Sequence, residues 1–432
     1  MHNEPSAAIR GQFWRYALPS MFSQLLNSCF IIVDGLFIGQ NLGDAGLAAI
    51  NVAWPVVAFI QAVSLAVGTG GAVRLATAQG RGDEAEALTA RGNAVTLLAV
   101  CAALLGVGLG LTYPYILPLI GANEELYPLS AAYIRVVCVL SACQVFATGL
   151  LPLVRSAGRT LGAMTVTVGG LLGNIFLDWL FIQRFQWGLP GAALATVIAQ
   201  ASSVLFSLGY MRRHPLPFSV RGRRRDVPRA VGRILRLGTP IALQDFLTTI
   251  SFLIITSIVN SLGLVASAGV GISEKLYVFL SIVPMSFMSA LSTFVAQNTG
   301  AQKTERIRRG IRSALWVSVG FCLVSSLLVC LFAAPLMGLF VEPGETEIIA
   351  VGVEYLRIEG MCYCGIGILF LLYGLFRGLG RPGVSVVLTV VSLGTRVALA
   401  YLLAPIPAVG LKGIWWAVPI GWVLADLAGL VL

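Results

Sequence analysis

Charged residues are scarce in this sequence, and so are the side chains on which most enzymes depend. Only 11% of the 432 residues are charged, whereas a soluble domain carries about 25%. The two histidines, His2 and His214, lie outside the apolar segments, and the eight cysteines lie within apolar runs without forming a CxxC pair. The sequence therefore disfavours a soluble fold. It predicts no enzyme, no metal site and no cofactor, with the cysteines as small core residues.

Long apolar runs dominate the chain instead. Hydrophobic residues make up 57% of it, and the mean hydropathy is +0.87. Runs of about 20 apolar residues recur from Phe13 to the end, and each is long enough to cross a bilayer as a helix. The first run is too long for the core of a signal peptide and has no small-residue cleavage site after it. We therefore predict an all-α polytopic membrane protein with twelve transmembrane helices. The predicted spans are 14–39, 45–72, 92–115, 129–153, 161–184, 190–212, 232–260, 264–297, 311–340, 350–376, 382–404 and 409–432.

The basic residues predict the orientation of these spans. With a cytoplasmic N-terminus, 23 of the 29 Lys and Arg residues fall in cytoplasmic segments and four in outer loops or outer helix ends. The positive-inside rule then places both termini in the cytoplasm. The net charge of +10 lies in short loops between spans, which argues against nucleic-acid binding. The basic run at 221–225 is expected to anchor the longest loop near anionic lipid.

The two halves of the chain repeat each other. The offset between matching motifs stays between 220 and 222 residues. Six spans per half is an even number, so the repeat is parallel, with its axis along the membrane normal. Such repeats are a transporter architecture, whereas a monomeric channel needs none. We expect two pseudo-symmetric six-helix bundles, at 1–212 and 229–432, joined by a basic cytoplasmic linker at 213–228. The matching motifs are 18–19 with 239–240, 79–80 with 299–300, 133–135 with 355–357, 155–159 with 377–381, and Gly191 with Gly413.

Several motifs resemble those of the MATE (multidrug and toxic compound extrusion) family. They are ValAspGlyLeuPheIleGlyGlnAsn and the residues that follow it to 55, GlyThrGly at 68–70, AlaGlnGlyArgGlyAsp at 78–83, ValAlaGlnAsnThrGlyAlaGln at 295–302, ArgSerAlaGlyArg at 155–159 and ArgGlyLeuGlyArg at 377–381. Together they are specific, and the resemblance covers essentially the whole chain. It implies twelve spans in two six-helix bundles and a secondary active multidrug exporter.

Six acidic residues lie within or near the predicted spans, where a charge is costly and usually functional. Asn174 precedes Asp178 by four residues, so both side chains share one helix face. Carboxylates, an amide and a hydroxyl offer mainly oxygen ligands, which suit a monovalent cation or a shared proton and do not suit zinc. A role in helix contacts alone is the alternative for Asn174, Asp178 and Thr196. The six acids are Asp34, Asp178, Asp245, Glu274, Glu359 and Asp426.

The resemblance is strongest to the archaeal and DinF-like branch of the family. That branch holds an Asp in span one, an Asn and an Asp four apart in span five, and a Thr in span six. The resemblance therefore implies a site for the coupling ion, Na⁺ or H⁺, at Asp34, Asn174, Asp178 and Thr196. The NorM-like branch has acids in spans seven and ten, but Thr248 and the glycine-rich segment 364–368 stand near those places here, which disfavours a second coupling site.

The other acids have two interpretations. Asp245 and Glu274 are candidates either for a substrate cavity or for structural ion pairs, and Glu274 and Lys275 should point to different faces of one helix. Glu359 and Asp426 are expected to be structural or interfacial. Broad substrate range requires an apolar, aromatic-lined cavity, for which the candidates are Phe30, Phe37, Trp54 and Tyr277.

The predicted function is cation-coupled antiport of amphipathic, often cationic compounds out of the cell. The partners are small molecules and the lipid bilayer, with no nucleic acid, and the chain is expected to act as a monomer in a bacterial or archaeal cytoplasmic membrane. The alternative is a lipid-linked oligosaccharide flippase of the same superfamily. A flippase favours a cationic cavity, and Lys275 and Arg396 are the only bases in the interior of the predicted spans, away from the span ends.

Overall fold

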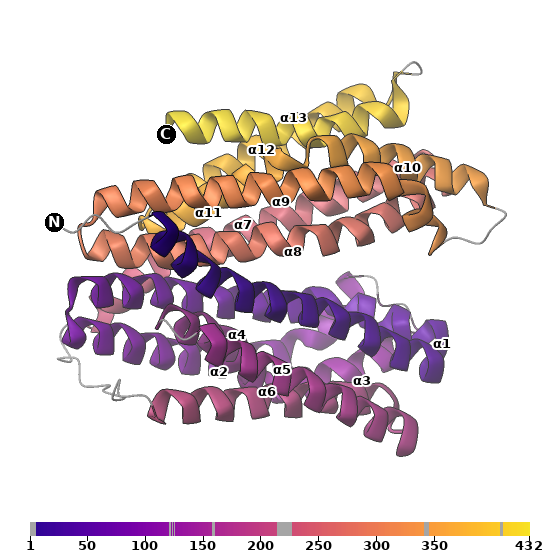
Figure 1. The fold of residues 1–432 in the computed structure, drawn as a ribbon. Coiled ribbons are helices and arrows are strands. Elements are labelled where there is room, and N and C mark those ends of the chain that lie inside the picture. Colours follow the sequence, from indigo (N-terminus) through magenta and orange to yellow (C-terminus); the bar gives the residue numbers. More distant parts are fainter. Residues whose placement is uncertain are drawn as a thin grey trace. The chain divides into compact units, whose positions relative to one another are not determined.

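The computed structural model describes residues 6–120, 122, 124, 126–157, 160–213, 227–340, 345–406 and 409–432. Every regular element in these ranges is a helix (Figure 1), which confirms the predicted all-α class. The first half contains α1 (Ser6–Arg81), α2 (Glu84–Leu119), α3 (Leu126–Val139), α4 (Ser141–Ser156), α5 (Thr160–Asp178), the π-helix η1 (Trp179–Arg184) and α6 (Gly188–Arg213). The second half contains α7 (Val227–Ser261), α8 (Leu264–Gly300), α9 (Thr304–Gly338), α10 (Thr346–Met361), α11 (Tyr363–Gly378), α12 (Pro382–Leu403) and α13 (Gly410–Val431).

The helices have the length and hydropathy of membrane spans. In the described ranges, nine single helices are long and apolar enough to span a membrane. If each of two bent helix pairs is counted as one span, the number of spans is eleven. Helices suit a bilayer because each one satisfies its own backbone hydrogen bonds. The predicted multi-span membrane protein is therefore confirmed. The first two predicted spans fall within one helical element, α1, of which Ala48–Arg81 meets the criteria for a span.

The two bent pairs occupy equivalent places in the repeat. Helices α3 and α4 meet at 61°, and α10 and α11 meet at 54°. The breaks lie at Leu140 and Cys362, which are 222 residues apart and both have a φ near −100°. Neither break residue is a proline, although proline is the usual cause of a sharp kink. The sequence pattern therefore predicts the spans at these places but not their bends.

The chain forms two compact units. The N-terminal unit comprises Leu18–Ala242, and the C-terminal unit comprises Met1–Ala17 with Leu243–Leu432. Each has its own apolar core, around Ile60, Leu98 and Leu150 in the first and around Tyr363 and Leu369 in the second. The chain passes from unit to unit within α1 and within α7, close to the prolines at 19 and 240. Most of the predicted linker lies outside the described residues.

Glycines allow very close helix contacts inside the N-terminal unit. A Cβ atom on Gly68 would lie 2.4 Å from the carbonyl oxygen of Gly149, and one on Gly238 would lie 2.1 Å from that of Ala66. Helices in membranes often pack through small residues, because apolar side chains gain little by leaving lipid for a protein interior. These contacts hold α1 against α4 and against the first part of α7.

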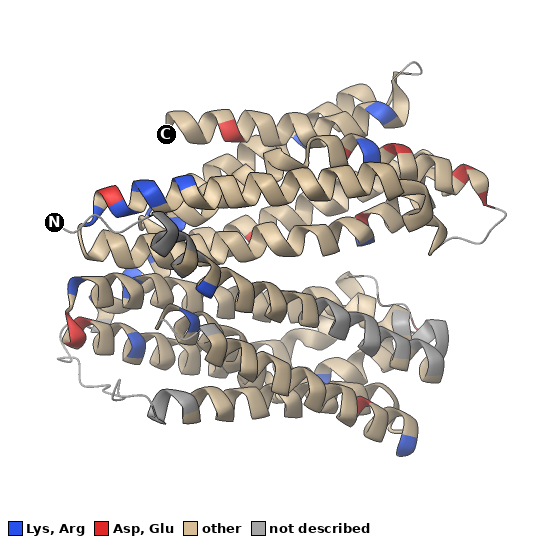
Figure 2. Cartoon of the chain, viewed as in Figure 1, with Lys and Arg blue, Asp and Glu red and all other residues tan. Residues whose placement is uncertain are grey.

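Charge is distributed unevenly along the second half (Figure 2). Lys303, Arg306 and Arg308 lie at the start of α9, whereas Glu345 and Glu347 lie beyond its far end, where α10 begins. Because α9 has 35 residues, these two ends are about 50 Å apart at the usual rise per residue. These basic and acidic residues therefore lie at opposite ends of α9.

Candidate functional site

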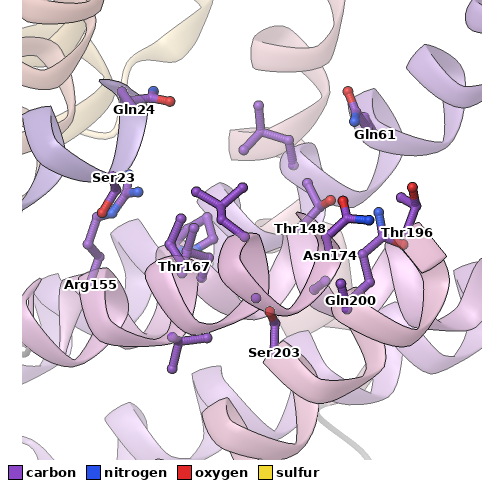
Figure 3. A pocket seen from close by; sticks show the side chains of 18 residues that line it. Ser23, Gln24, Gln61, Thr148, Arg155, Thr167, Asn174, Thr196, Gln200 and Ser203 are labelled. Atoms are coloured by element: carbon purple, nitrogen blue, oxygen red, sulfur yellow. The ribbon is translucent and has the colours of Figure 1, made fainter. Parts of the chain in front are cut away.

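A cavity of about 360 Å³ lies within the N-terminal unit. Helices α1, α4, α5 and α6 all contribute to its wall (Figure 3). Apolar side chains such as Leu65, Leu151 and Val166 form part of this wall, and the rest is polar. The polar lining residues are Ser23, Gln24, Gln61, Thr148, Arg155, Thr167, Asn174, Thr196, Gln200 and Ser203.

Three of the predicted coupling residues lie at or beside this cavity. Nδ2 of Asn174 donates a hydrogen bond of 2.9 Å to Oδ2 of Asp178. Asp178 is fully buried and Asn174 is 2% exposed. Asn174 and Thr196 line the cavity from α5 and α6, and Asp178 follows Asn174 by one turn of α5. The amide and the carboxylate therefore lie on one face of α5, as their four-residue spacing predicted.

The side chain of Asp34, the fourth predicted coupling residue, lies outside the described residues. Its place in the chain is within α1, ten residues after Gln24. Ten residues of helix rise about 15 Å. The structure therefore describes the α5 and α6 parts of the predicted site, and the α1 part stays a prediction.

A π-helix begins directly after Asp178. The element η1 covers Trp179–Arg184, and the amide of Phe185 donates to the carbonyl oxygen of Leu180 at its end. Short π-helical segments are rare and occur often at functional sites, because the extra residue in a turn re-aims the neighbouring side chains. The sequence pattern gave no indication of it. Its position places the irregular turn next to the buried carboxylate.

The structure adds polar residues that the sequence analysis did not select. Gln200 follows Thr196 by one helical turn, and its Oε1 atom is buried without a hydrogen-bond partner among the described residues. Arg155, which opens the ArgSerAlaGlyArg motif, also lines the cavity. The four-residue spacing from Thr196 was a usable signal for Gln200. Arg155 was assigned by its charge to a cytoplasmic segment between two spans, so its place in the cavity wall was not predicted.

Glu274 lies in the C-terminal unit and forms an ion pair. Its Oε1 accepts a hydrogen bond of 2.8 Å from the hydroxyl of Tyr355 and lies 3.3 Å from Nη2 of Arg396. The guanidinium of Arg396 also lies 5.1 Å from the ring centre of Phe252. Lys275 is exposed, so the two neighbours point to different faces as expected. This geometry corresponds to the ion-pair interpretation of Glu274.

Asp245 also lies in the C-terminal unit, next to a buried arginine. Nη2 of Arg377 donates a hydrogen bond of 2.8 Å to Oε1 of Gln244. The charge of Asp245, the following residue, interacts with that of Arg377. Asp245 is half-buried. The carboxylate therefore belongs to a polar group formed by α7 and α11.

Three of the four aromatic residues predicted for a substrate cavity do not line this cavity. Phe37 packs against the cluster around Ile38, Trp54 is 49% exposed, and Tyr277 stacks on Trp422 with ring centres 6.1 Å apart. None of these three is among the residues that line the cavity described above. The side chain of Phe30 lies outside the described residues. Their contact with a substrate stays a prediction.

Comparison with known proteins identifies relatives along the whole chain. The MatE family model matches residues 19–180 and 240–402. The probable multidrug resistance protein YoeA of Bacillus subtilis is 25% identical over 430 residues, covering 96% of this chain and 92% of YoeA. The FAD transporter of Shewanella oneidensis is 27% identical over 451 residues, covering 99% and 95%. The crystal structure of the Vibrio cholerae MATE transporter VcmN in the bent form matches with a TM-score of 0.92 at 23% identity, covering 99% and 96%. At that identity the structural match shows the fold alone.

Proposed function

Because the chain belongs to the MATE family, we propose that it exports amphipathic organic compounds from the cell and that an inward flow of Na⁺ or H⁺ drives the export. The observation that carries this proposal is the buried pair of Asn174 and Asp178 at the edge of a cavity lined by Asn174 and Thr196. The multidrug resistance protein YoeA, matched along nearly its full length, supports the same class of function.

Burial makes Asp178 a candidate site for the coupling ion. A carboxylate removed from water is costly unless a cation or a proton compensates its charge. Asp178 is fully buried, and the hydrogen bond from Asn174 occupies one of its oxygens. Binding of Na⁺ or H⁺ there stabilises whichever conformation holds the acid out of contact with water. Asp34 is proposed to complete the site from α1, as the resemblance to the DinF-like and archaeal branch implies.

Asn174 provides a physical link between ion and substrate. Its amide contacts Asp178, and it also lines the cavity. An ion that changes the position of this side chain changes the cavity wall at the same time. Coupling requires that the ion bind one conformation of the protein more tightly than the other. A ligand shifts a conformational equilibrium only by its differential affinity for the two states. A cavity of about 360 Å³ with a mixed polar and apolar wall suits a small amphipathic molecule.

Transport by reconstituted protein tests this function. Proteoliposomes receive an imposed Na⁺ gradient and then an imposed pH gradient, with ethidium as a cationic probe and ciprofloxacin as a zwitterionic one. The wild type should transport at least one probe under one of the two gradients. The gradient that drives transport identifies the coupling ion. Asp178→Asn and Asp34→Asn should lower the gradient-driven rate at least about tenfold, because a neutral amide needs no compensating cation.

Glu305→Gln is the matched control, because this carboxylate is exposed and pairs with Arg309 one turn away on α9. It should transport like the wild type. Full activity of Asp178→Asn would remove the proposed coupling site. Failure of the wild type with both probes under both gradients would favour the lipid-linked oligosaccharide flippase, which a lipid-translocation assay in the same liposomes tests directly.

A further inference from the structure

Basic residues gather at the start of α9 in the C-terminal unit (Figure 2), and two of them share an exposed helix face. Arg308 and Arg312 are four residues apart, so their side chains lie one above the other. Glu305, the acid of the first turn, pairs with Arg309 at 3.1 Å, and neither Arg308 nor Arg312 has an ion-pair partner among the described residues. Like charges at this spacing repel each other. An anion bound between the two guanidinium groups removes that repulsion.

The same face continues along α9 as an exposed apolar ridge. Trp316 lies one turn beyond Arg312 and is 70% exposed, more than any other tryptophan of the chain. Gly320 follows one turn later, and a Cβ atom there would meet nothing within 4 Å. Val324 and Leu328 come next at the same spacing and are 59% and 49% exposed. Neighbouring helices therefore leave this ridge largely uncovered, and in a membrane it contacts lipid.

The equivalent helix of the first half lacks this arrangement. The N-cap residues of α2 and α9, Asp83 and Lys303, lie 220 residues apart, within the offset of the repeat. At that offset Leu88, Gly92 and Thr96 stand in place of the two arginines and the tryptophan. Helix α2 has the length and hydropathy of a span without any of them. The two arginines and the tryptophan are therefore not needed to build the span, which indicates a role in binding.

We propose that Arg308, Arg312 and Trp316 bind the headgroup end of an anionic phospholipid, whose acyl chains lie along the ridge at Val324 and Leu328. A guanidinium pair suits the phosphate by charge and by its forked donors, and a zwitterionic headgroup brings a cation to the same place. Tryptophan prefers the headgroup level, because its ring is apolar and its N–H is a donor. From Trp316 to Leu328 the helix rises about 18 Å, close to the depth of hydrocarbon in one leaflet, about 15 Å.

Quenching of Trp316 fluorescence by spin-labelled lipids tests this site. The purified full-length protein is placed in phosphatidylcholine nanodiscs that contain an equal small fraction of labelled phosphatidylglycerol or of labelled phosphatidylcholine. Both lipids carry the spin label near the headgroup end of an acyl chain, and the contribution of Trp316 is the quenching that Trp316→Phe lacks. This contribution should show that phosphatidylglycerol associates about tenfold more strongly than phosphatidylcholine, because each basic residue near an anionic headgroup adds about fivefold.

Variants locate the lipid preference. Arg308→Gln combined with Arg312→Gln should lower it below about twofold, and the corresponding double lysine variant should retain most of it, because lysine keeps the charge. Arg229→Gln combined with Arg236→Gln is the matched control. It removes two exposed arginines from α7, in the N-terminal unit, and should leave the preference unchanged. All four arginines are exposed, so each variant should unfold thermally like the wild type in phosphatidylcholine.

Three results would overturn the lipid site. The first is equal quenching of Trp316 by the two labelled lipids in the wild type. The second is a preference that survives the double glutamine variant of α9, or that the α7 control also abolishes, because the overall charge of the protein then explains it. The third is a loss of quenching by phosphatidylglycerol when glycerol 3-phosphate is added in excess, which would assign the arginines to a soluble phosphate compound. None of these results bears on ion-driven transport, which the liposome assay tests separately.

Discussion

Arg396 is the cation that compensates Glu274 inside the C-terminal unit. Their side chains are only 8% and 17% exposed, and their nearest polar atoms lie 3.3 Å apart. Glu359 is a second carboxyl in the same unit, 3% exposed, and it also interacts with the charge of Arg396. One guanidinium thus serves two acids. Loss of one member of such a buried group leaves a charge without compensation, which is more costly than the pair is favourable.

Arg396→Gln should therefore lower the free energy of unfolding by about 3–5 kcal/mol. Tyr355→Phe removes the hydrogen bond to Glu274 and should cost about 1 kcal/mol. Lys275→Gln changes an exposed neighbour and should stay within about 0.5 kcal/mol of the wild type. Thermal unfolding of the purified proteins in one detergent measures the order of the three effects. A Lys275 variant as unstable as the Arg396 variant would contradict the role given to the ion pair.

The residue pattern predicts contacts within a helix better than contacts between helices. The four-residue spacing of Asn174 and Asp178 predicted a shared helix face, and in the structure their side chains are hydrogen-bonded on that face. The same spacing links Thr196 to Gln200. Arg155 was not predicted as a cavity residue because its charge placed it in a cytoplasmic segment between two spans. The packing of α4 against α1 and α5 brings it to the cavity wall. Helix packing of this kind is not encoded in a local spacing.

At the scale of elements, hydropathy predicts where the spans lie and leaves their bends undetermined. The predicted spans 129–153 and 350–376 correspond to bent helix pairs. Leu140 and Cys362, at the breaks, are ordinary residues for a membrane helix interior. Their equivalence in the repeat shows that the bend belongs to the architecture of each half. In physical terms, a bend set by contacts with neighbouring helices has no local sequence signal, unlike a bend set by proline.

Glycine positions provide a matched test of helix packing in α7. A Cβ on Gly238 would lie 2.1 Å from a carbonyl oxygen of α1, whereas one on Gly232 would meet nothing within 4 Å. Gly238→Ala forces two backbones apart and should lower the free energy of unfolding by about 1–3 kcal/mol. Gly232→Ala should raise it by about 0.5–1 kcal/mol, because alanine is the better helix former. Opposite shifts of the thermal unfolding midpoint are expected, and shifts of the same sign would contradict the close contact of α7 with α1.

For the whole molecule, the sequence predicted an all-helical membrane protein of the MATE family, and both conclusions are confirmed. The DinF-like branch, the coupling ion and the bundle limits stay predictions. The loop between spans six and seven led us to place the limits at 212 and 229, whereas close contacts divide the chain within α1 and α7. The difference has a physical origin. A long helix continues its backbone hydrogen bonds regardless of which neighbours its side chains meet, so a unit can end in the middle of a helix.

The charge pattern makes a prediction about the orientation of the whole chain. Lys and Arg are costly to move across a membrane against the positive-inside bias, and most of them lie in segments on one side of the predicted spans. In a cysteine-free background, Thr304→Cys at the start of α9 and Glu345→Cys before α10 place single thiols at exposed positions. A membrane-impermeant maleimide should label the second in intact cells and the first only after permeabilisation.

Asp83→Cys, in the exposed turn between α1 and α2, provides an independent check on the first half of the chain. Its segment shares the basic side with Thr304, so it too should be protected in intact cells. Labelling of Asp83→Cys and Thr304→Cys from outside, with protection of Glu345→Cys, would reverse the orientation. Labelling of Asp83→Cys and Glu345→Cys from outside, with protection of Thr304→Cys, would show that the halves enter from opposite sides. That result would contradict the parallel repeat, because an even number of spans per half requires both turns to face the same compartment.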